Sequence, residues 1–379
     1  MTASINVANR TRDFGAPVLA VCGFSGAGKT TLLEAAIPNM RALGLSVAVV
    51  KHDAHGFIVD KEGKDSDRLF RAGATVVLRG PAEQFQRRGA GDVLALEETL
   101  ADLARDHDIV LVEGHKQTPL PKLWLDSAEA SSIPPQVTQV LDILPWNGDR
   151  LQSFLRFFAQ WFAEAWTQRP LFAGLLVGGK SLRMGTPKQT LPFGNSTFGE
   201  IAAHALCQGL RNFAPAPLAC EADSEYPQLI LLGSGAVPKS LHYQPRLMDP
   251  PGLIGPLAAL LAAHRWAPSA AWVVSACDHP WLRSDEIEAL LQARQPGRWA
   301  IISRQRDGHP TPTLALYEPQ ALHLLERSLW TRGVEDTRLA QLFDDPHTWI
   351  TPHVLHGAES VNTPEMYAAA LLGHAAGTR

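Results

Sequence analysis

The sequence is poor in cysteine: Cys22, Cys207, Cys220 and Cys277 lie far apart and form no C-x-x-C pair. This spacing disfavours a structural zinc site or a disulfide framework and makes a reducing cytosol the default compartment. No apolar run approaches the roughly 18 to 20 residues of a membrane span. Residues 1–15 lack the apolar core of a signal peptide. We therefore expect a cytoplasmic protein that does not enter a membrane.

An excess of positive charge is also missing, because 34 Lys and Arg face 38 Asp and Glu, which gives a net charge of -4. Nucleic-acid binding usually requires a basic excess or stripe, and binding to a membrane surface requires a basic amphipathic helix. Neither partner is expected. A chain of 379 residues with 45% hydrophobic residues is long enough for two domains, each with its own core.

Short apolar runs alternate with helix-like segments, and this pattern starts again in the middle of the chain. It predicts an α/β fold with two doubly wound, mostly parallel sheet domains. The predicted strands are 17–24, 45–52, 108–114, 171–179, 271–278 and 299–304, and the first predicted helix is 30–43.

Apolar residues at helical spacing predict a helix over 149–166, and Pro170 prevents its continuation. We place the domain boundary near 168–170. The predicted organisation is a flexible tail (1–16), a first domain (17–168) and a second domain (170–379). Residues 213–240, rich in Pro and Ala, show no clear pattern.

The stretch "GFSGAGKT" matches G-x-x-x-x-G-K-[ST] and stands between a predicted strand and a predicted helix. Backbone N–H groups and the helix N-terminus of such a loop bind phosphate. Lys29 is expected to reach the β- and γ-phosphates, and Thr30 to hold Mg²⁺. Glu113, at the end of a buried strand, is the candidate Walker-B-type carboxylate, whereas Asp108 at the other end of that strand is expected to be solvated.

Downstream of this loop, "KHDAHGF", "DKEGKDSDRLFRAGA" and "VEGHKQTPLPK" follow in order. With the loop, they resemble the molybdopterin-guanine dinucleotide biosynthesis adapter family, MobB, over about residues 17–145. The resemblance implies a GTP-binding protein with weak hydrolysis that assists a partner enzyme. Its two histidines, His52 and His55, are expected to make hydrogen bonds rather than to bind metal. The implied GTP contacts are Gly23, Phe24, Ser25, Gly26, Ala27, Gly28, Lys29, Thr30 and Thr31.

A second glycine-rich turn stands in "LLVGGKSLRMGTPKQTLPFG", with Arg183 and Lys188 close behind Gly178 and Gly179. Nucleotidyl transfer brings two anionic phosphates together, so neutralising charge is its main task. Arg183 and Lys188 can supply that charge, and Lys188 is the preferred phosphate contact. Asp278 ends an apolar strand, where a carboxylate can hold Mg²⁺ at the carboxyl edge of the sheet.

Asp249 stands before a Pro-Pro-Gly turn and is either a second acid, contacting nucleotide or metal, or only a turn-former. Cys277 is expected to be a small packed residue. His279 and His309 are not expected to be catalytic.

The second turn, with "DPPGLIGPLAALLAA", "VVSACDHPWL" and "SVNTPEMY", resembles the molybdenum cofactor guanylyltransferase family, MobA, over about residues 171–372. With the MobB resemblance, this resemblance implies that the first α/β domain is P-loop NTPase-like and the second a Rossmann-like nucleotidyltransferase. It also implies transfer of GMP from GTP to Mo-molybdopterin, with Mg²⁺, giving the guanine dinucleotide and pyrophosphate. Lys188, Arg183 and Asp278 would be catalytic. The implied GTP contacts are Leu176, Val177, Gly178, Gly179, Lys188, Asp249 and Asp278.

The sequence departs from the MobA pattern where Val177 replaces alanine, "PLAA" replaces "PLAG", and Cys220 or Glu221 stands near an expected asparagine. The alternatives are a molybdopterin cytidylyltransferase, a sugar-phosphate nucleotidylyltransferase, or a GTP-driven delivery adapter whose second half only binds cofactor. The double glycine favours GTP over CTP, and Lys188 with Asp278 disfavours a pure binder. Molybdoenzymes or their chaperones are the expected protein partners.

Overall fold

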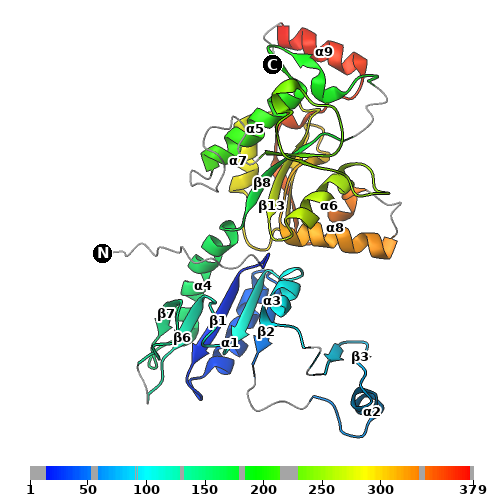
Figure 1. Cartoon of the computed structure of the whole chain (residues 1–379). Coiled ribbons are helices and arrows are strands. Elements are labelled where there is room, and N and C mark those ends of the chain that lie inside the picture. The colour runs from blue at the N-terminus through cyan, green and yellow to red at the C-terminus, as the bar shows by residue number, and fades with distance from the viewer. Residues whose placement is uncertain are drawn as a thin grey trace.

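The computed structural model describes residues 14–52, 59–89, 91, 93–128, 132–178, 184–213, 229–332 and 338–375. Two central sheets dominate this part of the chain (Figure 1). None of the described helices is long and apolar enough to cross a membrane.

The first sheet has the strand order β2-β5-β1-β6-β7, and every neighbouring pair is parallel. Buried side chains of α1 and α4 pack on one face, and those of α3 pack on the other. The strands are β1 (Val18–Gly23), β2 (Val47–Lys51), β5 (Ile109–Glu113), β6 (Lys122–Leu125) and β7 (Val140–Leu144); the helices are α1 (Lys29–Ala42), α3 (Leu96–Ala104) and α4 (Arg150–Thr167).

A small unit leaves the first sheet after β2. It consists of α2 (Asp65–Arg71) and the antiparallel strands β3 (Val76–Arg79) and β4 (Gln84–Arg87), and Figure 1 shows it standing away from the sheet. Arg87 joins its parts, since Arg87 Nη1 lies 2.9 Å from Asp67 Oδ1 and the guanidinium covers the Phe70 ring.

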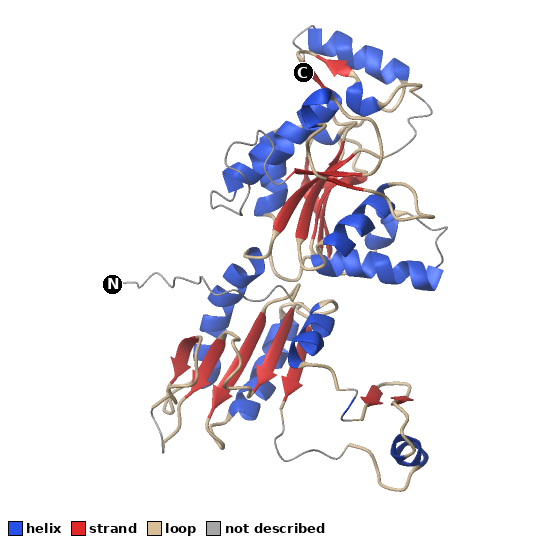
Figure 2. Ribbon diagram, viewed as in Figure 1, coloured by secondary structure: helices blue, strands red, loops and turns tan. Residues whose placement is uncertain are grey.

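The second sheet has the order β12-β11-β8-β13-β15-β14-β16, in which only β15 runs antiparallel to its neighbours. Helices α5 and α7 cover one face, and α6 and α8 cover the other (Figure 2). Its strands are β8 (Leu171–Leu176), β11 (Leu229–Leu232), β12 (Arg246–Leu247), β13 (Ala271–Ala276), β14 (Ala300–Arg304), β15 (Pro310–Tyr317) and β16 (Thr348–Val354).

The helices of this second part are α5 (Phe198–Phe213), α6 (Pro256–Trp266), α7 (Ser284–Gln292), α8 (Pro319–Arg332) and α9 (Pro364–Ala375), and a two-stranded ribbon is formed by β9 (Pro192–Phe193) and β10 (Ser196–Thr197). The predicted doubly wound, mostly parallel α/β fold is therefore confirmed. Every strand and helix predicted above has its counterpart within a few residues. The domain boundary near 168–170 stays a prediction; α4 ends at Thr167 and β8 begins at Leu171.

The amino ends of both sheets face each other. Gln320 donates to the carbonyl of Gly15, which precedes β1, at 2.9 Å. Trp299, which precedes β14, donates from Nε1 to Asp108, which precedes β5, at 2.8 Å. The carboxyl ends of β1 and β8 therefore point to opposite ends of the molecule (Figure 1).

One prediction about this boundary is wrong. Asp108 is fully buried rather than solvated, because Ser46 donates to its Oδ2 from both N and Oγ, at 2.7 and 2.8 Å, while Trp299 bonds its Oδ1. Residues 1–13 of the predicted tail lie outside the described residues, and at its end Ala16 is buried and the Gly15 carbonyl accepts from Gln320. Two of these partners, Trp299 and Gln320, lie in the second half of the chain.

A cluster of buried charged side chains also lies at this boundary. Glu318 accepts from Arg294 Nε at 2.6 Å and from Arg169 Nη1 at 3.1 Å. Burial lowers the pKa of Arg169 to about 10, and nearby Glu318 opposes this shift, so the guanidinium stays charged at neutral pH. Arg169 Nε and Nη2 are buried without a hydrogen-bond partner among the described residues, so the network is only partly satisfied.

Candidate functional site

The first glycine loop connects β1 to α1 and has the backbone that phosphate binding requires. Gly28 has φ +81°, a left-handed conformation that glycine adopts without strain. Lys29 folds back over the loop, donating to the Phe24 carbonyl at 2.8 Å. Burial lowers the pKa of Lys29, and the nearby Lys116 ammonium lowers it further. An anion entering this loop would relieve that crowding of positive charge.

Thr30 and Glu113 lie together, as the sequence predicts. Thr30 Oγ1 donates to Glu113 Oε1 at 2.7 Å, and Lys51 Nζ lies 4.0 Å from the same oxygen. β5 and β1 are parallel neighbours, so the carboxyl end of β5 brings Glu113 beside the loop. A hydroxyl and a carboxylate are the hard oxygen donors that suit Mg²⁺.

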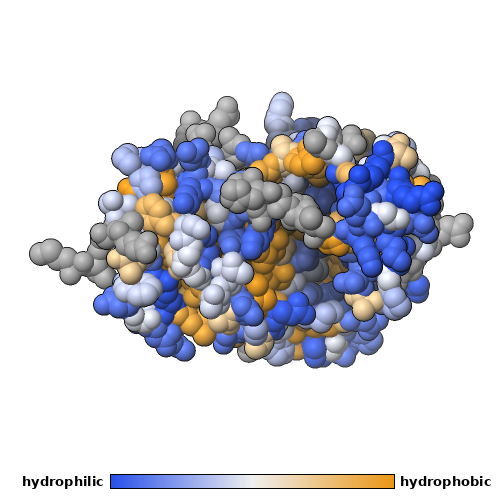
Figure 3. Space-filling model, turned by 90° about the horizontal axis from the view of Figure 1, so that it is seen from below, coloured by the Kyte–Doolittle hydropathy of each residue, from blue (hydrophilic) through white to orange (hydrophobic). Residues whose placement is uncertain are grey.

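Two residues near this loop were not singled out from the sequence. Arg150, at the start of α4, donates to the Ala27 carbonyl at 2.7 Å and also to the Asp126 carbonyl. Lys116, after β5, lies over the Phe24 ring, with Nζ 5.2 Å from its centroid. Viewed from below, this end of the molecule is hollowed, with apolar side chains beside the hollow (Figure 3).

The second glycine loop begins at the carboxyl end of β8. Its Gly179 and Arg183 lie outside the described residues, as do His55, Cys220 and Glu221. The side chains of Leu176 and Val177 are buried in the core, so a ligand can meet only their backbone. Valine in place of alanine at 177 therefore changes the core packing and not the surface that faces a ligand.

Lys188, Asp278 and Asn362 converge at the same edge of the second sheet. Lys188 Nζ lies 3.2 Å from Asp278 Oδ2 and donates to Asn362 Oδ1. The backbone N–H of Val361 donates to the Asp278 carbonyl at 2.9 Å, which ties the segment carrying Asn362 to the end of β13. Asn362 was not among the candidates, although "SVNTPEMY" carried the resemblance to the MobA family.

Asp249 lies beside Gly178. A Cβ built on Gly178 would stand 3.7 Å from Asp249 Oδ2. Asp249 Oδ1 is buried and has no hydrogen-bond partner among the described residues, and burial raises the pKa of this carboxyl. An orphaned carboxylate oxygen beside a glycine loop fits a cation or a donor group of a ligand better than it fits a turn-former.

The other residues considered near this edge of the sheet are Cys277, His279 and His309. Cys277 is buried in the core, as predicted, and burial raises the pKa of its thiol to about 12. His279 is buried, with Nε2 3.7 Å from Asp278 Oδ1, whereas His309 is exposed beside Asp307.

Comparison with known proteins divides the chain in the same way. Residues 18–144 match the family model "Molybdopterin guanine dinucleotide synthesis protein B", MobB. Residues 173–345 match the "MobA-like NTP transferase domain".

Among curated relatives, the molybdopterin-guanine dinucleotide biosynthesis adapter protein of Haemophilus influenzae is 40% identical over 131 residues, covering 32% of this chain and 70% of that protein. A molybdenum cofactor biosynthesis bifunctional protein of Synechocystis is 26% identical over 207 residues, covering 53% of this chain and 54% of that protein, so the match spans about half of its length.

Among solved structures, molybdopterin-guanine dinucleotide biosynthesis protein A from Archaeoglobus fulgidus is 20% identical, with a TM-score of 0.38, covering 53% of this chain and 96% of that one. The chain belongs to the MobB adapter family through its first sheet and carries a MobA-like NTP transferase domain in its second, so it is a molybdenum cofactor biosynthesis protein with a nucleotidyltransferase domain.

Proposed function

We propose that the second domain transfers GMP from GTP to Mo-molybdopterin, forming molybdopterin guanine dinucleotide and pyrophosphate. The terminal phosphate oxygen of molybdopterin attacks the α-phosphorus of GTP. The new P–O bond forms as the bond between the α-phosphorus and the bridging oxygen breaks, and that oxygen leaves with pyrophosphate. The observation that carries this proposal is the group formed by Lys188, Asp278 and Asn362 at the carboxyl edge of the sheet.

The protein's part in this reaction is to bind and to neutralise charge. In the structure Lys188 balances the Asp278 carboxylate. When a triphosphate binds, we expect Lys188 to turn to the phosphate oxygens and Asp278 to be freed. Asp278 and Asp249 would hold Mg²⁺, which supplies the remaining charge stabilisation when bound. No protein nucleophile is needed, because the acceptor phosphate attacks directly.

A pocket of about 590 Å³ lies next to this group. Glu359, Ser360 and Val361, which immediately precede Asn362, line it, together with Trp281 and Met366. We assign this pocket to the acceptor. Its aromatic and thioether side chains suit a flat pterin ring, and its position beside Asn362 would bring the acceptor phosphate to the triphosphate.

For the first domain we propose GTP binding with weak hydrolysis, assisting cofactor loading or delivery to a molybdoenzyme or its chaperone. Lys29, the helix N-terminus of α1 and the Thr30–Glu113 pair support this role. The carboxyl ends of β1 and β8, where the two glycine loops begin, point to opposite ends of the molecule (Figure 1). Each would therefore bind its own nucleotide.

The proposal is tested by product mass. The purified full chain is incubated with molybdopterin, molybdate, Mg²⁺ and each nucleoside triphosphate separately. We expect the guanine dinucleotide with GTP and little product with CTP, ATP or UTP. A cytosine dinucleotide formed in preference would make the chain a cytidylyltransferase. Absence of product with every nucleotide, while GTP hydrolysis persists, would favour the delivery adapter with a non-catalytic second domain.

A further inference from the structure

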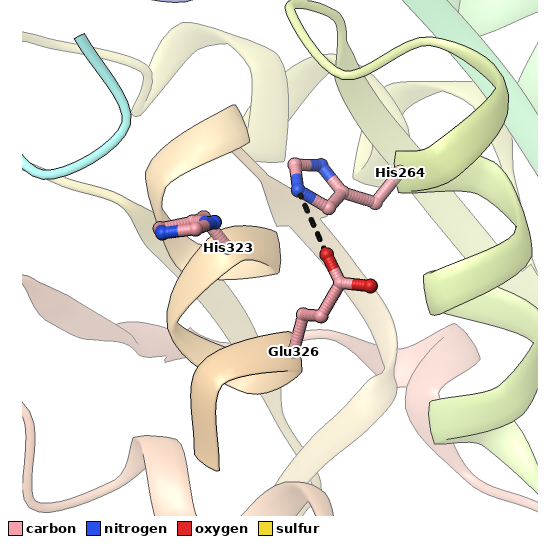
Figure 4. Close-up of side chains that lie close together, drawn as sticks. All are labelled: His264, His323 and Glu326. Atoms are coloured by element: carbon pink, nitrogen blue, oxygen red, sulfur yellow. Dashed lines mark ion pairs between the residues drawn. The ribbon is translucent and has the colours of Figure 1, made fainter. Parts of the chain in front are cut away.

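Two histidines and a glutamate gather on α6 and α8, outside both glycine loops. His264 lies in the last turn of α6, and His323 and Glu326 lie three residues apart on α8, a spacing that puts them on one helix face. One ligand atom from each lies within 4.8 Å of those from the other two. Figure 4 shows the His264 ring and the Glu326 carboxylate turned toward each other, with the His323 ring beside them.

The three side chains of the cluster lie close together but form no hydrogen bond with one another. His264 Nε2 and Glu326 Oε2 are 3.8 Å apart, which is too long for a hydrogen bond. His264 Nδ1 is buried without a partner among the described residues, and the His264 side chain is only 6% exposed. Buried imidazole nitrogens normally have partners. The packing of α6 on α8 alone therefore does not explain why a histidine stands here.

The protonation states suit a metal ion. Burial lowers the pKa of His264 to about 4 and also lowers the pKa of His323. Both rings are therefore neutral at neutral pH, the form in which histidine binds metals. Glu326 Oε1 accepts from Arg265 Nε at 2.7 Å, which fixes the carboxylate with Oε2 toward His264. Two imidazoles and one carboxylate form a donor set that Zn²⁺ prefers.

A fourth residue, from the half of the chain that forms the first sheet, lies beside the cluster. Asp106, just after α3, has Oδ1 4.0 Å from His323 Nε2, and the same oxygen accepts from Arg327 Nη1 at 2.8 Å. This separation is too long for a hydrogen bond, but histidines that bind metals commonly direct their second ring nitrogen to a carboxylate, so we expect metal binding to turn the His323 ring toward Asp106. The cluster is thus joined to both halves of the chain.

We propose that His264, His323 and Glu326 bind one Zn²⁺, with Asp106 orienting His323, and that the bound ion strengthens the contact between the two halves. Zinc bonds of about 2.0 to 2.2 Å place tetrahedral ligand atoms about 3.4 Å apart. The ligand atoms of this cluster lie within 4.8 Å of one another, so zinc binding requires side-chain rotations that bring them closer. Three protein ligands leave the fourth position for water.

The test is zinc binding by the intact chain. Full-length protein is stripped with EDTA, supplied with excess Mg²⁺ to occupy hard-oxygen sites, and dialysed against limiting ZnCl₂. We expect one tightly held Zn²⁺ in the wild type, and none at this site in His323→Gln or Glu326→Gln. Co²⁺ in place of Zn²⁺ should give the d–d absorption of a four-coordinate site. His204→Gln, at an exposed position on α5, is the matched control and should match the wild type.

Folding of each variant is checked by circular dichroism. His323 and Glu326 are both partly exposed, and one folded variant is enough for the comparison. Equal zinc content in the wild type and in a folded α8 variant would overturn the site, and so would the absence of zinc in the wild type. Asp106→Asn should keep the stoichiometry, weaken zinc affinity about 10- to 100-fold, and reduce the rise in Tm that zinc produces. An unchanged affinity would overturn the role given to Asp106.

Discussion

The Lys188 ammonium lies 3.2 Å from the Asp278 carboxylate, at the end of β13 and beside the second glycine loop. Each group is only 16 to 17% exposed, so water screens the pair poorly. The pair is the chemical centre of the proposed transferase. A nucleotide must replace the carboxylate as the partner of the lysine.

The first prediction concerns Asp278. Asp278→Asn keeps the shape of the side chain but removes the charge proposed to hold Mg²⁺. Loss of one such electrostatic element typically lowers the rate about 10²- to 10³-fold. Pyrophosphate release in the presence of molybdopterin and GTP measures the effect. Asp285→Asn, at an exposed position on α7, is the control and should leave the rate unchanged. Full activity in Asp278→Asn would rule out this assignment.

The second prediction concerns Asn362. Its side-chain oxygen accepts from Lys188, so Asn362→Ala should leave the ammonium less well oriented toward phosphate. A hydrogen bond to a charged group contributes about 1.5 to 3 kcal/mol, so we expect kcat/KM to fall about 10- to 100-fold. Asn212→Ala, on the exposed side of α5 and paired with Glu288, is the control. If both variants behaved alike, Asn362 would have no part in positioning Lys188.

Local pattern was enough to predict the first site. A loop motif and a strand end place Thr30 and Glu113 at one edge of a parallel sheet, and the two side chains are hydrogen-bonded. Parallel neighbours bring their carboxyl ends together, whatever the length of chain between them. The loop motif and the fold class together therefore predicted the pairing.

The residues that sequence reasoning missed depend on contacts between distant segments. Asn362 meets Lys188 across 174 residues, and Arg150 reaches Ala27 across 123. Asp108 resembles an ordinary polar strand end, but Trp299 and Ser46 bury it. No periodicity within either segment carries information about such a partner. Only the tertiary packing of the folded chain creates it, and for Trp299 and Asp108 this is the packing of one sheet against the other.

The third prediction concerns the boundary between the sheets. Trp299→Phe keeps the aromatic packing but removes the N–H that bonds Asp108, leaving a buried carboxylate oxygen without that donor. An unsatisfied buried group costs about 1 to 3 kcal/mol, so the free energy of unfolding should fall by that amount. Urea unfolding followed by circular dichroism measures it. Trp330→Phe is the control, because Trp330 is 85% exposed and such changes usually stay within about 0.5 kcal/mol. Equal stability of the two variants would contradict this role for the Trp299–Asp108 contact.

The fourth prediction separates the two nucleotide sites. Lys29→Ala deletes the charge that the first loop offers to phosphate, so GTP hydrolysis should collapse. The second loop has its own Lys188 and stands at the opposite end of the molecule. Transfer to free molybdopterin, measured with the purified chain, should therefore survive within a few-fold. Lys188→Ala should do the reverse and leave hydrolysis intact.

Cofactor insertion in cells is a separate readout of the same two variants. It requires both the product and its delivery, so it should fall in Lys29→Ala and in Lys188→Ala alike. The decisive measurement is therefore the purified transfer assay. Loss of transfer in a correctly folded Lys29→Ala protein would contradict independent sites. Because the two loops lie at opposite ends of the molecule (Figure 1), we would then infer that the first domain controls the second through the buried contacts of Asp108 and Gln320.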